Sequence, residues 1–466
     1  MGVTKDLSKF LAELKYDYLP KDVTEKTKRL ILDYLGYSII AINEPPAKIL
    51  YQLILDQGKP PEESTIIGYG KKTSCLNATL INSAMGHMCE MDDTHRLTGS
   101  HPGDSIIPSA LAIAEKVSAD GKEFITAVVA GYEAALRIGA GVCPAHYLKG
   151  WHTSGTICTF GAAAAAGKIF NFNVDEMENT LGLAGVQVGG IFGDAPSEKS
   201  EVTFMTKDLR PGKAGWNGVF SALLTSKGFT GNKGILENER GFCALYSDKY
   251  NLNKITENMG HHFKVMEVAH KPYSACRFIH PAIDATLGLV DKYKITSEMV
   301  DEIIAESYNY VALGMDNMNP IVPYGPRFSI QFQIALSLLE GREGLKKIMV
   351  NDAYASKKLQ EPLFRSTMNK VKTLYNKEMD KEWSEDCLYS AKVKIKLLNG
   401  KLYESYIAYP KGEPENDMTK EELEEKYIML ATKIIPIDTA KLILNKVEQL
   451  ETLTDINALS NLFIKQ

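Results

Sequence analysis

The sequence predicts a mainly α protein with a large all-α domain and a smaller α+β domain inserted before the C-terminal helices. Apolar residues recur at helical spacing from residue 20 to about residue 270. The pattern then changes to strands and turns, and it returns to helix near the C-terminus. A chain of 466 residues also exceeds the size at which one hydrophobic core stops growing. We therefore expect one domain from residues 1–269 and 405–466, and a second from residues 270–404.

The helical part contains both amphipathic and very small-residue segments. In residues 22–41, Leu30, Ile31 and Tyr34 recur with a spacing near that of a helix. In HTSGTICTFGAAAAAGKIF, residues 152–170, the run of alanines favours helix and permits close neighbours. Neither GxxxxGK[ST] nor a strand-anchored GxGxxG is present, so close helix packing is a better interpretation than a phosphate-binding loop.

Strand signals appear after residue 270. Residues 299–313 contain one strand pattern, and residues 391–410 alternate on both sides of Asn399-Gly400, the preferred two-residue hairpin turn. Residues 410–418, PKGEPENDM, are the best linker candidate. Thr419 and Glu422 then form the pattern of a capping box ahead of a final helical segment.

Composition excludes several classes of function. The formal charge of −5 leaves no electrostatic footprint for nucleic acid or for an anionic membrane. No apolar run approaches the roughly 18–20 residues of a membrane helix. The seven cysteines are scattered and no CxxC occurs, which argues against a disulfide framework or a structural zinc site. We expect a cytoplasmic protein.

The segment CEMDDTHRLTGSHPGDS, residues 89–105, crowds proton-handling groups into a loop-like stretch. Asp92 and Asp93 beside His95, with His101 further on, are able to supply a general base and a carboxylate that sets its pKa. A solvated helix end is the alternative. Metal binding is a rival interpretation, but DDxH is a generic spacing and HExxH is absent.

Two further segments place polar groups at the starts of apolar helices. His152, in GWHTSGT, stands just ahead of the alanine-rich helix, where helix N–H groups favour an anion; a neutral helix-capping histidine is the plainer alternative. Lys207, Arg210 and Lys213 lie on a Gly/Pro-containing stretch, residues 205–218. These cations are able to hold substrate carboxylates, although most such clusters are solvated faces.

A fourth segment, AHKPYSACRFIHPAIDA, residues 269–285, contains charged residues between apolar ones. Charged groups such as Lys271 and Arg277 in such a setting are usually paired or functional. Cys276 is either a nucleophile or, more commonly, a small buried thiol. Together the four segments supply histidines, an aspartate and several cations, which fits proton transfer next to the carboxylates of a small acidic substrate.

The same segments, in the same order and spacing, resemble the MmgE/PrpD family over essentially the whole chain. They are MDDTHRLTGSHPGDSIIPSALAIAE, GWHTSGTICTFGAAAAAGKIF, TKDLRPGKAGWNGVFSALL and KPYSACRFIHPAIDA. The family includes 2-methylcitrate dehydratases, cis-aconitate decarboxylases and iminodisuccinate epimerases. The resemblance implies an all-helical domain plus an α+β lid domain, a homodimer, and chemistry without metal or organic cofactor.

The resemblance also implies the residues of the site. It assigns catalysis to Asp93, His101, His152, Lys207 and Lys271. It places His95, Arg210 and Cys276 near the substrate. His101 is the expected principal acid/base, and Asp93 is expected to orient it or to share its work.

The sequence thus predicts a lyase that acts on a small di- or tricarboxylate without metal or cofactor, with a hydro-lyase ranked slightly ahead of a carboxy-lyase. Acid/base chemistry at a carbon next to a carboxylate serves dehydration, decarboxylation and epimerisation alike. An epimerase of an iminodisuccinate-like acid is therefore one alternative. A non-catalytic carboxylate-binding protein is another, and a metallohydrolase is a third.

Overall fold

The computed structural model describes residues 2–193 and 205–463. Among these residues the chain forms two compact units. The first unit contains residues up to 192, residues 205–268 and the segment from 419 onward, and the second contains Gly193 and residues 269–418. The domain limits expected from sequence, residues 1–269 with 405–466 and residues 270–404, stay predictions.

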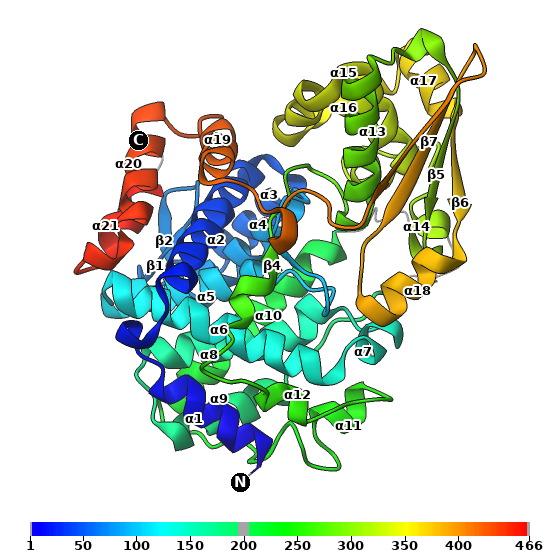
Figure 1. The fold of residues 1–466 in the computed structure, drawn as a ribbon. Helices are drawn as coiled ribbons and strands as arrows, with labels where there is room; N and C mark the ends of the chain where they lie inside the picture. The colour runs from blue at the N-terminus through cyan, green and yellow to red at the C-terminus, as the bar shows by residue number, and fades with distance from the viewer. Residues whose placement is uncertain (1, 194–204, 464–466) are drawn as a thin grey trace. The chain divides into compact units, whose positions relative to one another are not determined.

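The first unit consists mainly of helices (Figure 1). Its small strands are β1 (Ser64–Ile66) and β2 (Lys71–Thr73), which pair antiparallel, and β3 (Thr94–His95). β4 (Val268–Ala269) lies where the chain passes to the second unit. Its helices are α1 (Val3–Glu13), α2 (Lys21–Ile40), α3 (Pro45–Asp56), α4 (Cys75–Met88), α5 (Gly103–Val117), α6 (Gly121–Val142), α7 (Ala145–Leu148), α8 (Thr153–Ile169), α9 (Val174–Gly185), α10 (Thr206–Thr225), α11 (Phe242–Tyr246), α12 (Asn253–Thr256), α19 (Lys420–Ala431), α20 (Ile437–Glu448) and α21 (Asn457–Ser460).

Helix α8 forms the centre of this unit and packs against α5, α6 and α10. Nearly all of its side chains are buried, including the run from Ala162 to Ala166. At the crossing with α6, a Cβ added to Gly161 would lie 2.8 Å from the carbonyl oxygen of Gly131. Small residues are therefore needed because the two backbones approach closely, as the sequence predicted.

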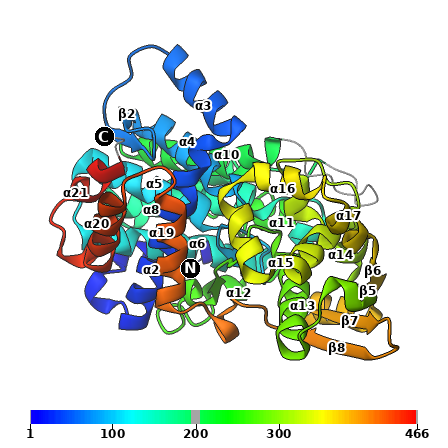
Figure 2. The ribbon, with the colours of Figure 1, turned by 90° about the horizontal axis from the view of Figure 1, so that it is seen from above.

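The C-terminal helices return to the first unit. Figures 1 and 2 both place α19 beside α2, and the two helices pack against each other. The predicted capping box is confirmed: the Thr419 side chain accepts from the N–H of Glu422, and the Glu422 carboxylate accepts from the N–H of Thr419. This return lets the last segment of the chain contribute a lysine to the site described below.

From the sequence we expect no segment long and apolar enough to cross a membrane, and helix α6 is an exception. By length and composition it meets that criterion. However, 94% of its apolar window is buried inside the structure, as in the core helix of a soluble protein. Glu133 and Arg137 interrupt its sequence, and they satisfy each other in the interior through a 2.7 Å ion pair.

The second unit combines helices with one four-stranded sheet in the order β6-β5-β7-β8. β5 pairs parallel with β6 and antiparallel with β7, which pairs antiparallel with β8. Helix α13 packs against β7 and β8. The elements are α13 (His280–Tyr293), β5 (Val300–Ser307), α14 (Asn309–Gly314), α15 (Ile330–Val350), α16 (Asp352–Lys358), α17 (Pro362–Asn369), β6 (Val371–Tyr375), α18 (Lys377–Asp386), β7 (Ala391–Leu397) and β8 (Leu402–Ile407).

The predicted hairpin is present as β7 and β8, with Val393, Ile395 and Leu397 on the buried face. The predicted two-residue turn is wrong by one residue. Leu397 and Lys401 are the last hydrogen-bonded pair, so the loop contains Leu398, Asn399 and Gly400. Gly400 adopts a φ of 83°, which is the left-handed conformation typical of three-residue hairpin loops.

The prediction of a mainly α protein is confirmed, with strands confined largely to the second unit and to short pairs in the first. A lid function for the second unit stays a prediction.

Candidate functional site

Ends of several helices in the first unit meet around one cluster of ionisable side chains. The last turn of α4 provides His87, and the loop that follows provides Asp92, Asp93 and His101. Three further residues come from helix starts: Asp104 from α5, His152 from α8 and Lys207 from α10. The four residues His101, Asp93, His152 and Lys207, expected from sequence to share a site, thus all lie in the first unit.

Hydrogen bonds fix the loop between α4 and α5. The N–H of His101 donates to Ser154 Oγ at 2.9 Å, and the Thr153 hydroxyl donates to the carbonyl of Gly99 at 2.9 Å, so the loop is tied to the start of α8. From α19, Lys426 donates to the carbonyl of Met91 at 2.9 Å and pairs with Asp33 at 2.7 Å. These contacts hold Asp92 and His101 on a rigid support.

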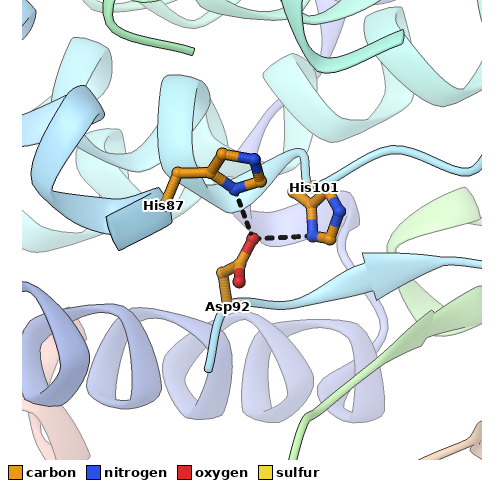
Figure 3. A group of neighbouring side chains, drawn as sticks. All are labelled: His87, Asp92 and His101. Atoms are coloured by element: carbon orange, nitrogen blue, oxygen red, sulfur yellow. Dashed lines mark hydrogen bonds and ion pairs between the residues drawn. The ribbon is translucent and has the colours of Figure 1, made fainter. Parts of the chain in front are cut away.

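Asp92 lies at the centre of the cluster (Figure 3). Its Oδ2 is 2.8 Å from His87 Nδ1 and 2.6 Å from His101 Nδ1. A carboxylate against Nδ1 favours the tautomer with the proton on Nδ1, which leaves Nε2 of His101 able to accept a proton. The same carboxylate stabilises the imidazolium that forms once Nε2 is protonated.

His101 is the member of this trio best placed to meet a ligand. Its side chain is 17% exposed, whereas the side chains of His87 and Asp92 are 1% and 0% exposed. Burial, reinforced by the charge of Lys207, lowers the pKa of His87 to about 3, so His87 is neutral near pH 7. These two histidines therefore differ in role: His101 is able to exchange a proton with a ligand, while His87 is a neutral partner of Asp92.

The Asp93 carboxylate forms its hydrogen bonds with Tyr132 and Gly103 and not with the histidines. It accepts from the Tyr132 hydroxyl at 2.6 Å and from the N–H of Gly103 at 3.0 Å. Its contact to His101 is through the backbone carbonyl, 3.1 Å from Nδ1. Burial raises the pKa of Asp93 to about 7, and the charges of Asp92 and Asp33 add to this. The side chain that orients His101 is thus Asp92, while a catalytic role for Asp93 stays a prediction.

The raised pKa of Asp93 predicts a stability that falls as the pH rises. The pKa of Asp93 in the folded state lies above the ordinary value of 3.8, so the folded state retains a proton that the unfolded state releases. This contribution is complete below about pH 4 and is lost as the pH rises through about 7. We expect Asp93→Asn, which carries no titratable proton, to remove this part of the pH dependence.

The measurement is the melting temperature of both proteins between about pH 4 and pH 8. Relative to Asp93→Asn, the wild type should lose stability with rising pH, by on the order of 1 kcal/mol for each unit of pKa shift. Asp104 is present in both proteins, so the difference reports on Asp93. Parallel pH profiles would show that Asp93 does not titrate in this range.

Asp104 adds a second buried carboxyl group. Its Oδ2 lies 3.0 Å from His87 Nδ1, and its side chain is 0% exposed. Burial, followed by the charges of Asp92 and Asp93, holds the pKa of Asp104 well above its usual range. The interior thus contains protonated and ionised carboxyl groups next to each other, an arrangement typical of sites that handle protons.

Lys207 lies next to this cluster, and its side chain is 6% exposed. Its ammonium group donates to the carbonyl of His87 at 2.8 Å and pairs with Glu90 Oε1 at 2.6 Å. Glu90 has a φ of 52°, an uncommon left-handed conformation for a residue other than glycine. A substrate carboxylate at Lys207 would therefore share this cation with Glu90, a residue to which the sequence analysis assigned no role.

His152 and Arg210 lie beside the cluster. The rings of His152 and His87 have centroids 5.8 Å apart, and His152 also contacts Phe192 at 5.2 Å. Burial, with the charge of Arg210, lowers the pKa of His152 well below its usual value. Arg210 donates to the carbonyl of Phe192 and lies over its ring. His152 is thus a neutral, buried neighbour, and its Nδ1 has no hydrogen-bond partner among the described residues.

The remaining predicted residues lie elsewhere. Both ring nitrogens of His95 are bonded, to Thr98 Oγ1 at 3.0 Å and to Glu267 Oε2 at 2.9 Å, which favours a structural role. Lys271 and Cys276 belong to the second unit, where both side chains are buried. The predicted substrate contacts of these three residues stay predictions.

Comparison with known protein families identifies the chain. Residues 5–254 match the MmgE/PrpD N-terminal domain, and residues 273–452 match the MmgE/PrpD C-terminal domain. The chain belongs to the MmgE/PrpD family. The resemblance inferred from the four sequence motifs is therefore confirmed.

Similar curated proteins of this family are cis-aconitate decarboxylases. The one from Aspergillus terreus is 25% identical over 485 residues, which cover 99% of this chain and 96% of that protein. Those from Mus musculus and Homo sapiens are each 24% identical over 477 residues. These alignments cover 99% of this chain and 93% and 94% of the mouse and human proteins.

Sequence reasoning for this MmgE/PrpD chain missed His87 and Asp104, and it did not separate Asp92 from Asp93. His87 is a lone histidine in an apolar helix, and Asp104 resembles an ordinary acidic residue in a first helical turn. One usable signal existed. Adjacent residues in an extended segment point to opposite sides, so only one of Asp92 and Asp93 was able to face His101.

Proposed function

We propose that this chain is a metal- and cofactor-independent lyase that acts on a small tricarboxylate, with decarboxylation of a cis-aconitate-like acid as the first candidate reaction. Lyase chemistry itself follows from membership of the MmgE/PrpD family and from its decarboxylase relatives. The observation that supports this reaction most is the short contact between His101 Nδ1 and Asp92 Oδ2, next to the buried cation of Lys207.

In the proposed reaction, the bond between a substrate carbon and one carboxylate breaks and CO2 leaves. The electron pair stays on the carbon and is delocalised into the neighbouring unsaturated acid. Protonated His101 then donates its Nε2 proton to that carbon or to its conjugated neighbour, while Asp92 stabilises the imidazolium beforehand. The positive charge of Lys207 offsets the developing negative charge.

The same groups support dehydration, the second candidate reaction, in which His101 acts first as a base and not as an acid. Neutral His101 would take a proton from a carbon next to a carboxylate through Nε2, and hydroxide would leave with a proton from an acid in the site. The family contains such dehydratases by our sequence analysis, whereas the curated relatives described above are decarboxylases. This difference ranks decarboxylation first.

The test is proton NMR of the purified protein with cis-aconitate, 2-methylcitrate, citrate and iminodisuccinate, in the presence of EDTA. We expect loss of cis-aconitate and appearance of a decarboxylated alkene while the chelator is present. A new alkene from 2-methylcitrate would instead assign dehydration. Unchanged spectra for every acid, or activity abolished by EDTA, would contradict the proposal.

We also propose that the protein resides in the cytoplasm and forms a homodimer. All seven cysteines are free thiols, five of them buried, which fits a reducing compartment. The dimer is an expectation from the family alone. Light scattering during size-exclusion chromatography tests it, because a monomeric mass would contradict the proposal.

A further inference from the structure

We propose that His87, Asp92 and His101 also form a binding site for Zn²⁺, and that zinc bound there inhibits the enzyme. The binding of the metal stands on the geometry of these three residues. Its inhibitory effect rests on the proposed function, in which His101 is the acid/base. The site would therefore regulate the reaction rather than take part in it.

The donor atoms are of the type and number that zinc prefers. Two imidazole nitrogens and one carboxylate oxygen all lie within 4.8 Å of one another. Figure 3 shows that both Nδ1 atoms point at the same oxygen, Asp92 Oδ2. Three protein ligands with a fourth position left for water or another ligand are typical of accessible zinc sites.

The distances require only a small adjustment. Zinc bonds to nitrogen and oxygen are about 2.0–2.2 Å long, so tetrahedral ligands lie roughly 3.3 Å apart. The two nitrogens now lie 2.8 Å and 2.6 Å from the oxygen. A shift of roughly half an ångström would open this space for the ion. Zinc would then occupy both Nδ1 atoms, and each neutral ring would carry its proton on Nε2 instead.

The surrounding charge favours a dication. The Asp92 carboxylate lies between the two histidines, and the ammonium group of Lys207 pairs with Glu90 at 2.6 Å, which offsets its positive charge. Asp104 lies 3.0 Å from His87 Nδ1, and its side chain is fully buried. Asp104 is thus placed to support a ligand histidine or to complete the coordination.

The site is also preformed and reachable. His87 is fixed by the last turn of α4, while hydrogen bonds tie the loop carrying Asp92 and His101 to α8 and α19. His101, at 17% exposure, provides the approach from solvent. Zinc on Nδ1 of His101 would require the single proton of the neutral ring to sit on Nε2 and would occupy Asp92, so His101 would lose its ability to cycle a proton.

The test titrates Zn²⁺ into metal-stripped protein in competition with a fluorescent zinc indicator. We expect one site per chain in the wild type. Asp92→Asn and His87→Gln should each lower the zinc affinity at least ~100-fold, since loss of a residue that only hydrogen-bonds to a ligand already lowers metal affinity roughly 10–100-fold. His261→Gln, at an exposed histidine remote from these ligands in sequence, is the matched control and should bind as the wild type does. Equal affinity in Asp92→Asn, or no binding by the wild type, would overturn the site.

Two further measurements keep the result clear. Circular dichroism would show whether the two ligand variants are folded. If neither is, Co²⁺ added to the wild type should give the visible absorption of a four-coordinate site with nitrogen and oxygen ligands. Absence of this absorption band would overturn the site. Zinc should inhibit turnover, and EDTA should restore it. Zinc that binds without inhibiting overturns the regulatory part. If no substrate is turned over, the proposed function fails, and the zinc titration still decides the site.

Discussion

Replacing His101 with glutamine should lower kcat for the proposed carboxylate substrate by at least about 10²-fold, the usual range for the loss of a general acid/base. Glutamine retains polarity and much of the volume, but it has no nitrogen that is able to cycle a proton. The contact to Asp92 at 2.6 Å then has no imidazolium to stabilise. Steady-state kinetics with the substrate found by NMR provide the measurement.

The matched control for this variant is His261→Gln, which removes an exposed histidine from the same unit. It should keep the kcat and the melting temperature of the wild type. Since the side chain of His101 is partly exposed, His101→Gln should also remain folded. A folded His101→Gln enzyme with nearly full kcat would remove His101 from the role of acid/base.

Lys207→Met should have the largest effect on stability. It leaves the Glu90 carboxylate, 3% exposed, without the cation 2.6 Å away. Breaking a buried ion pair from one side typically costs about 3–5 kcal/mol, because an uncompensated charge stays in the interior. Chemical denaturation should show this loss. Lys213→Met, on the exposed face of the same helix, is the control and should change stability little.

A double variant separates folding from function at this position. Lys207→Met with Glu90→Gln removes both charges, and it should recover much of the lost stability, since replacing both partners of a buried pair is often nearly neutral. It should not recover binding of the carboxylate substrate, so KM should remain raised. A double variant with the KM and kcat of the wild type would exclude Lys207 as a substrate contact.

Local patterns in the sequence were sufficient for much of the fold. The capping box at Thr419, the alternation around Val393 and the alanines of α8 each predicted an element that the structure contains. The failures have physical causes. The hairpin loop has three residues instead of the two predicted, because Gly400 adopts the left-handed conformation that closes a three-residue loop. Helix α6 met the length and apolarity of a membrane span because it lies in the core.

The site was less predictable because its connections are long-range. The His101 and Asp92 pair lies within one loop, and the sequence analysis came close to it. The contacts of Lys207 with Glu90 and of Lys426 with Met91 join residues more than a hundred positions apart. No spacing rule predicts such pairs, and only the packing of α10 and α19 brings them together.

The most direct test of the central claim compares wild type and His101→Gln with cis-aconitate in D2O. The account predicts that the wild-type product carries one solvent deuterium on a carbon that has lost CO2 or on its conjugated neighbour, detected by NMR. His101→Gln should form this deuterated product at least about 10²-fold more slowly. Equal rates in the two proteins, or a product formed without solvent deuterium, would contradict proton donation by His101.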